Sequence, residues 1–184
     1  MGILEKLRPQ PRWKHADPSV RIAAVYDLGA DDAEALQALA KEDPDARVRR
    51  AAVTRIDDVA LLGEIARTDP DEDVRAEAIR GLAGVAAEAD QVEQAIEASR
   101  QLLALGRTKE IVLVARESSS PAVRAAIIDL IEDSKALGSV SRHAQDGSTR
   151  LRALARLTEA DEILNVALKS EHTDRSEEHT SELQ

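Results

Sequence analysis

Five short stretches of this chain share one pattern, in which an aliphatic residue is followed by arginine. A small polar residue, aspartate or serine, stands four positions before each arginine. The gaps between successive arginines are 28, 26, 49 and 28 residues. A repeated period of this size predicts stacked supersecondary units rather than one globular core. The five pairs are Val20-Arg21, Val48-Arg49, Val74-Arg75, Val123-Arg124 and Leu151-Arg152.

The composition favours helices throughout. Aromatic residues make up 1% of the 184 residues, and they are Trp13 and Tyr26 alone. The apolar residues that remain are mostly leucine, isoleucine, valine and alanine. Leucine and alanine are strong helix formers, and the small alanine side chain allows helices to approach closely. We therefore predict an all-α chain that is built from thin repeated layers.

Each arginine pair lies near the start of a predicted helix. In the second copy, apolar residues at Val48, Ala51, Ala52 and Ile56 recur at spacings typical of one helix face. The fifth copy keeps this stripe through leucine and alanine residues at 151, 154 and 155. In every copy the polar residue four positions before the arginine is expected to cap the helix, and in two copies a proline follows the cap directly.

A second, shorter helix is predicted after each first one. The connections of two to four residues require antiparallel neighbours. The gap of 49 residues leaves room for a longer helix at 90–105, which we interpret as an inserted or degenerate unit. The predicted second helices cover residues 32–41, 58–67, 108–117, 134–144 and 159–169.

These elements divide the chain into three parts. Residues 1–12 form a lead-in helix and a proline-containing linker, and 13–169 form the repeat domain, with an irregular unit at 84–107. The repeat domain is expected to be an α-solenoid of five to six antiparallel helix pairs with a right-handed superhelix. Residues 170–184 read as a disordered tail. The last ten of these, 175–184, resemble a translated DNA-sequencing adapter, so we expect the natural protein to continue past Asp174.

Helix pairs with Asp-Pro turns and Val-Arg near a helix start resemble HEAT-like repeats. The clearest stretch runs from Asp43 to Val53. Its short period resembles the repeats of phycobilin-lyase-type HEAT-like proteins. The opening from Pro11 to Arg21 is similar to the start of certain large proteobacterial proteins, in which such repeats precede a coiled-coil domain of unknown function. The resemblance implies no enzymatic activity.

Charge and cysteine content narrow the function classes. The formal net charge of −10 argues against a nucleic-acid groove, because such grooves bind phosphates through lysine and arginine. No cysteine is present, so a thiolate metal site and a cysteine nucleophile are excluded. His143 has no second predicted ligand, so we expect neither a metal nor another cofactor. No apolar run is long enough to span a membrane, and the expected location is the cytoplasm.

The arginines admit a structural and a functional interpretation. A cation in the first helical turn meets the positive end of the helix dipole, which costs a few tenths of a kcal/mol or more. Carboxylates are therefore expected beside the arginines, either the caps Asp17, Asp45 and Asp71 or the equivalent acid of the next repeat, and these would form a structural ladder. Alternatively, the arginines form a row of donors on the concave face for an acidic partner.

The candidate interaction surface follows from this second interpretation. The predicted caps Ser120 and Ser148 carry no charge, so they cannot neutralise Arg124 and Arg152. Trp13 either belongs to a binding patch or covers the core of the first repeat. The candidate residues are Arg124, Arg150, Arg152, Trp13 and His15.

The sequence favours a non-catalytic interaction or scaffold module. Its expected partner is another protein or the missing C-terminal part of the same chain, and no small-molecule substrate is expected, because stacked repeats present extended surfaces. An accessory or lyase-like enzyme component is the alternative, and it would need a pocket with converging polar groups. A nucleic-acid binder is a third alternative, and it would need a continuous basic face.

Deletion of residues 175–184 should leave the thermal midpoint unchanged, because we predict no native structure there. The measurement is a melt of the full chain beside the shortened chain, followed by circular dichroism. A large drop in midpoint would mean that the segment belongs to the fold.

Overall fold

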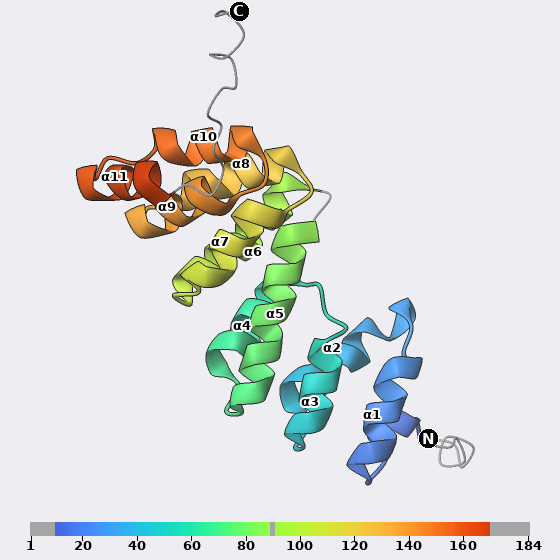
Figure 1. Ribbon diagram of the computed structural model, residues 1–184. Helices are drawn as coiled ribbons and strands as arrows, with labels where there is room; N and C mark the ends of the chain where they lie inside the picture. Colours follow the sequence, from blue (N-terminus) through green and yellow to red (C-terminus); the bar gives the residue numbers. More distant parts are fainter. Residues whose placement is uncertain (1–9, 89–90, 170–184) are drawn as a thin grey trace, which may run out of the picture. The chain divides into compact units, whose positions relative to one another are not determined.

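The computed structural model describes residues 10–88 and 91–169, and over these ranges the chain is all-α (Figure 1). This confirms the predicted class. No strand occurs in the described ranges. Eleven α-helices and two 3-10 helices occur there: η2 (Arg12–Lys14), α1 (Pro18–Asp27), η3 (Ala30–Asp32), α2 (Ala33–Glu42), α3 (Ala46–Val53), α4 (Val59–Thr68), α5 (Glu72–Glu88), α6 (Val92–Ala104), α7 (Thr108–Glu117), α8 (Pro121–Leu130), α9 (Ser134–His143), α10 (Gly147–Ala155) and α11 (Ala160–Lys169).

Contacts within the chain define two compact units. The first ends at Val85 and the second begins at Ala86, so α5 contributes to both. In the first unit, α3 packs against α1 and α2, and η2 packs against α1 (Figure 1). In the second unit, α8 packs against α6, α7 and α10, and α9 packs against α7, α10 and α11. Each unit therefore buries its apolar faces between short neighbouring helices.

The predicted helix starts are confirmed in the first four copies. The carboxylate of Asp17 accepts a hydrogen bond from the amide of Ser19 at 2.8 Å, and a proline fills the first position of α1. Equivalent bonds to backbone amides are accepted by Asp45, Asp71 and Ser120. These side chains satisfy amide groups that the first helical turn leaves without partners.

The second helices also match their predicted ranges. Helices α2, α4, α7, α9 and α11 begin and end within one residue of the expected positions. Asp58 accepts a bond from the amide of Leu61, and Asp133 accepts one from the amide of Ala136, so α4 and α9 start on equivalent caps. The expected inserted helix corresponds to α6.

A Schellman motif joins α6 to α7. Gly106 has a φ of +68°, a conformation that costs other L-residues about 1–2 kcal/mol. Its amide donates to the carbonyl of Leu103, and the amide of Arg107 donates to the carbonyl of Leu102, both at 2.9 Å. The glycine therefore ends α6 and turns the chain within two residues.

The predicted apolar stripes are buried for the most part in the first four copies, although Ala23 of the first copy is exposed, and the prediction for the fifth copy is wrong. In α3, for example, Val48 and Ala52 are fully buried. In α10, Leu151 is 67% exposed and Leu154 is 36% exposed, whereas Thr149 and Ala153 are buried. The buried face of α10 is therefore rotated away from the predicted leucines, and the reason lies in the register of its cap, described below.

The predicted terminal segments lie largely outside the described residues. Of the lead-in at 1–12, residues 1–9 are outside, and the described part ends in η2. The tail at 170–184, including the adapter-like segment at 175–184, is outside as well. In the described ranges, no helix combines the length and the apolar character that a membrane crossing requires.

Replacing Ala52 by leucine should lower the free energy of unfolding by about 1–3 kcal/mol, because the added atoms have no room in a packed interior. Ala60 lies exposed on α4, so Ala60→Leu is the matched control and should change stability little. Urea titrations of both variants measure the effect. An unchanged midpoint for Ala52→Leu would show that Ala52 does not pack against a neighbouring helix.

Candidate functional site

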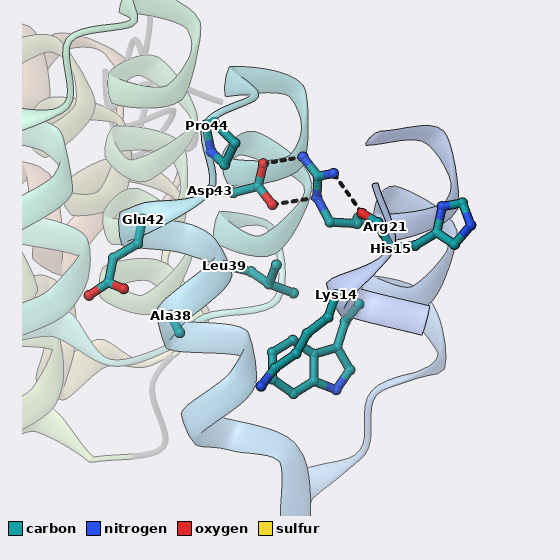
Figure 2. Close-up of a pocket in the computed structure, with 9 residues that line it drawn as sticks. Lys14, His15, Arg21, Ala38, Leu39, Glu42, Asp43 and Pro44 are labelled. Carbon is teal, nitrogen blue, oxygen red and sulfur yellow. Dashed lines mark hydrogen bonds and ion pairs between the residues drawn. The ribbon is translucent and has the colours of Figure 1, made fainter. Parts of the chain in front are cut away.

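Two arginines of the first unit form buried, bidentate salt bridges with aspartates, called two-point bonds below. Arg21 donates through Nε and Nη2 to the two carboxylate oxygens of Asp43, each at 2.7 Å (Figure 2). Arg49 donates in the same way to Asp69, at 2.8 and 2.9 Å. All four side chains are at most 10% exposed. In each case the acid lies in the turn before the next first helix, so the bond ties one helix pair to the next.

The remaining nitrogen of each arginine binds the turn before its own helix. Nη1 of Arg49 donates to the carbonyl of Asp43 at 2.9 Å, which is six residues earlier in the chain. The same bond to the carbonyl six residues earlier recurs for Arg21, Arg75, Arg124 and Arg150, at 2.6 to 3.2 Å. This recurring contact identifies the five equivalent arginines by geometry.

The fifth equivalent arginine is therefore Arg150, and the predicted register of that copy is wrong by two residues. The cap of α10 is Asp146, not Ser148, and it accepts the amide of Thr149 at 2.7 Å. Thr149 is buried where the other copies carry valine. Thr149 has nearly the shape of valine but is not aliphatic, so Thr149-Arg150 does not fit a pattern of an aliphatic residue followed by arginine. Leu151-Arg152, two residues later, does fit it.

Carboxylates compensate Arg21 and Arg49, as the structural interpretation requires. Their two-point partners are the acids of the next turn, not the caps Asp17 and Asp45. The hydrogen bond that Arg21 donates to Asp43 raises the pKa of Arg21, and the one that Arg49 donates to Asp69 raises the pKa of Arg49. Burial opposes ionisation of Asp69, but hydrogen bonds from Arg49 and a backbone amide outweigh it and lower its pKa.

In the second unit, the equivalent arginine, Arg124, has different hydrogen-bond acceptors. Ala144 stands where Asp43 and Asp69 stand in the first unit, so no carboxylate is available there. Nε of Arg124 instead donates to the hydroxyl of Thr149 at 3.0 Å, and Nη2 lies 3.7 Å from the carboxylate of Asp146. Hydrogen bonds from the hydroxyl of Ser148 and then from Thr149 hold the pKa of Asp146 well below its usual range.

Arg152 is not one of the five equivalent arginines, which we call the ladder arginines, and its side chain is half-exposed. Its guanidinium pairs with the carboxylate of Asp129 on α8, with one contact of 3.2 Å from Nε. The hydrogen bond to Asp129 raises the pKa of Arg152. The groove beside this pair has a volume of about 130 Å³ and includes Ser148 and Thr149. Arg152 thus presents a paired but accessible charge.

Trp13 and His15 belong to the first unit, where they line a shallow, open pocket beside Arg21 (Figure 2). The ammonium group of Lys14 lies 4.6 Å from the centre of the Trp13 ring. Nδ1 of His15 accepts a hydrogen bond from the amide of Asp17 at 3.0 Å. The five candidate residues therefore fall into two groups: Trp13 and His15 in one unit, and Arg124, Arg150 and Arg152 in the other.

Two further arginines link successive helix pairs and were missed by the sequence analysis. Arg55 donates to the carbonyls of Val25 and Leu28 at the end of α1, at 2.6 and 3.0 Å. Arg156 donates to the carbonyl of Ile128 near the end of α8, at 2.5 Å. Both stand six residues after a ladder arginine, and this spacing was the signal that could have found them.

A continuous basic face would have to be built from eight lysine and arginine residues, and the structure places most of them among acids. Carboxylates lie within 4.0 Å of Arg12, Arg47, Arg49, Arg50, Arg142 and Arg152. Arg150 donates to two backbone carbonyls. Within the described residues, no three histidine, aspartate or glutamate side chains gather as a metal site would need. The set comprises Arg12, Lys14, Arg47, Arg49, Arg50, Arg142, Arg150 and Arg152.

Comparison with known proteins gives no match: no family model, no curated protein and no solved structure is significantly similar to this chain.

Replacing Asp69 by asparagine should lower the free energy of unfolding by about 3 kcal/mol at pH 7, because the buried Arg49 would lose its counter-charge. The lowered pKa of Asp69 means that its contribution is present above about pH 4 and is lost as the pH falls through the folded-state pKa. The stability gap between the two proteins should therefore narrow at pH 3.

Urea unfolding at both pH values measures this gap. Asp129→Asn is the control, because it removes a carboxylate from a half-exposed pair with Arg152, and it should shift the midpoint much less. Equal effects of the two substitutions at pH 7 would contradict the structural role of the buried pair.

Proposed function

We propose that this chain is a non-catalytic scaffold module, a right-handed α-solenoid of HEAT-like repeats that binds another protein. The partner is a separate chain or a further part of the same polypeptide, and the proposed setting is the cytoplasm. The observation that carries the proposal is the recurring arginine contact. In five first helices, an arginine at the same position donates to the carbonyl six residues earlier.

Such positional equivalence supports a stack of similar layers over a single-centred core. Each layer would contact only its neighbours, and the stack would present a long surface made from equivalent positions. Two-point bonds such as Arg49 to Asp69 would hold successive layers in register. A rigid extended surface of this kind suits the recognition of another protein.

Within that surface, the groove beside Arg152 is the proposed contact site. Arg152 is about half-exposed, so a partner carboxylate could compete with Asp129 for the guanidinium without opening the core. Arg124 and Arg150 are less suitable, since both are held by hydrogen bonds within the fold. The partner chemistry we propose is an acidic protein segment.

Photo-crosslinking in the cells that carry the gene tests this proposal. A benzoyl-phenylalanine residue in place of Ser148, which is exposed beside Arg152, should give a discrete protein adduct. Arg152→Glu should reduce the adduct about tenfold or more, equivalent to about 1.4 kcal/mol of binding free energy. Arg100→Glu, which changes an exposed arginine on α6, is the matched control and should have no effect.

Three outcomes would count against the proposal. Adducts made only with nucleic acid would favour a nucleic-acid binder. Adducts made only with a small chromophore would favour the lyase-like alternative. A protein adduct that persists equally in Arg152→Glu would show that the groove beside Arg152 is not the contact site.

A further inference from the structure

Because Asp146 is the cap of α10, equivalent positions in the helix pairs can be counted from the cap of each first helix. The residue eight places after the cap is Val53 in α3 and Ile128 in α8, and both are at most 1% exposed. The corresponding residue of α10 is Leu154, which is 36% exposed. In the pair α10–α11, this position is therefore still apolar, but it is not buried as it is in α3 and α8.

The second helices show the same contrast. Seventeen places after the cap stand Leu62 in α4 and Leu137 in α9, which are at most 2% exposed. The corresponding residue of α11 is Ile163, which is 41% exposed. Leu164 and Leu168 on the same helix are 58% and 75% exposed. A group of exposed large apolar side chains on one surface marks an interaction site more often than isolated ones do.

In the second unit, the following helix pair is what covers this face. Helix α10 packs against α8 and α9, and α11 packs against α9. The carboxylate of Glu162 lies over Gly138, in the space that a Cβ atom at that position would occupy. Arg156 donates to the carbonyl of Ile128 from the same side. The burial of Ile128 and Leu137 thus has a structural cause in the next pair.

We propose that Leu154, Ile163, Leu164 and Leu168 form a docking face for one further helix pair of the same repeat type. This face continues the interface between α8–α9 and α10–α11, in which such a pair buries the equivalent positions. This inference rests on the proposed stacking of repeats, and it names the class of partner that the last pair accepts.

The face also specifies two features of its partner. Leu164 stands where α4 and α9 carry the buried glycines Gly63 and Gly138, so an apolar side chain must meet it in place of Glu162. An arginine in the turn just after the partner's first helix should reach the carbonyls at the end of α10, as Arg55 reaches those at the end of α1. Residues 43–69 of this chain supply both features, because Leu61 stands at the position of Glu162.

The test uses the full chain with a second copy of residues 43–69 inserted directly after Lys169. The chain contains no cysteine, so Ile163→Cys introduces a single thiol into the face. The rate at which a maleimide modifies this thiol reports how often the face is open to solvent. We expect the insertion to slow modification about tenfold or more and to add helical circular dichroism.

Two controls make the result specific. In the first, the inserted copies of Leu61 and Leu62 are replaced by serine, and modification should then return to the rate of the chain without the insertion. In the second, Tyr26→Cys places the thiol in the first unit, at a side chain that is 62% exposed. The insertion should leave its modification rate unchanged.

Several results would overturn the proposal. The thiol at position 163 could react as fast with the insertion as without it, or the insertion could add no helix, since it has no other apolar face on which to fold. Protection that appears in the chain without the insertion and grows with protein concentration would mean that a second copy covers the face. Failure of crosslinking at Ser148 would leave this result untouched, so the two proposals fail separately.

Discussion

A buried guanidinium is costly unless its charge and its donors find partners, and this constraint organises the first unit. Arg49 donates to both oxygens of Asp69 and to the carbonyl of Asp43, so one side chain binds the turn before its own helix and the turn before the next. Unpaired, a charge at this depth would cost several kcal/mol. The distance between the two turns is therefore fixed by the reach of one arginine.

The second unit keeps the arginine but changes its acceptor. With Ala144 in the turn, Arg124 depends on a threonine hydroxyl and on the more distant carboxylate of Asp146. Here the bonds within the turn remain, while the charge-to-charge part of the link is weaker. The carboxylate of Glu162, whose pKa is lowered mainly by the hydrogen bond from Arg142, supplies another ionic link between helix pairs in this unit.

The candidate site shows how an accessible charge differs from a structural one. Arg21 and Arg49 are nearly inaccessible, so their roles end within the fold. Arg152 carries the same group on a half-exposed side chain, where water competes with Asp129 and weakens the pair. Trp13 and His15 are anchored by local contacts around the first helix. Exposure, more than residue type, separates binding candidates from structural residues.

Local chemistry accounts for what could be predicted from the sequence. Caps such as Asp17 and Asp58 accept hydrogen bonds from amides only two or three residues away, so they can be predicted from a short stretch of sequence. Helix ranges followed from these caps and from the spacing of apolar residues. The register of the fifth copy was missed because the pattern required an aliphatic residue. The buried Thr149 fills the space that valine fills in the other copies.

By itself the sequence determined the helices, the starts of all the first helices except α10 and the recurrence of arginine in the first turn, because each depends on neighbours within about one helical turn. Only the tertiary structure decided which acid each arginine binds, since Arg21 and Asp43 are separated by 22 residues. It also decided that the apolar face of α10 and α11 is left exposed, whereas the equivalent faces are covered. Burial is a property of what packs against a residue, and that is set by elements distant in the chain.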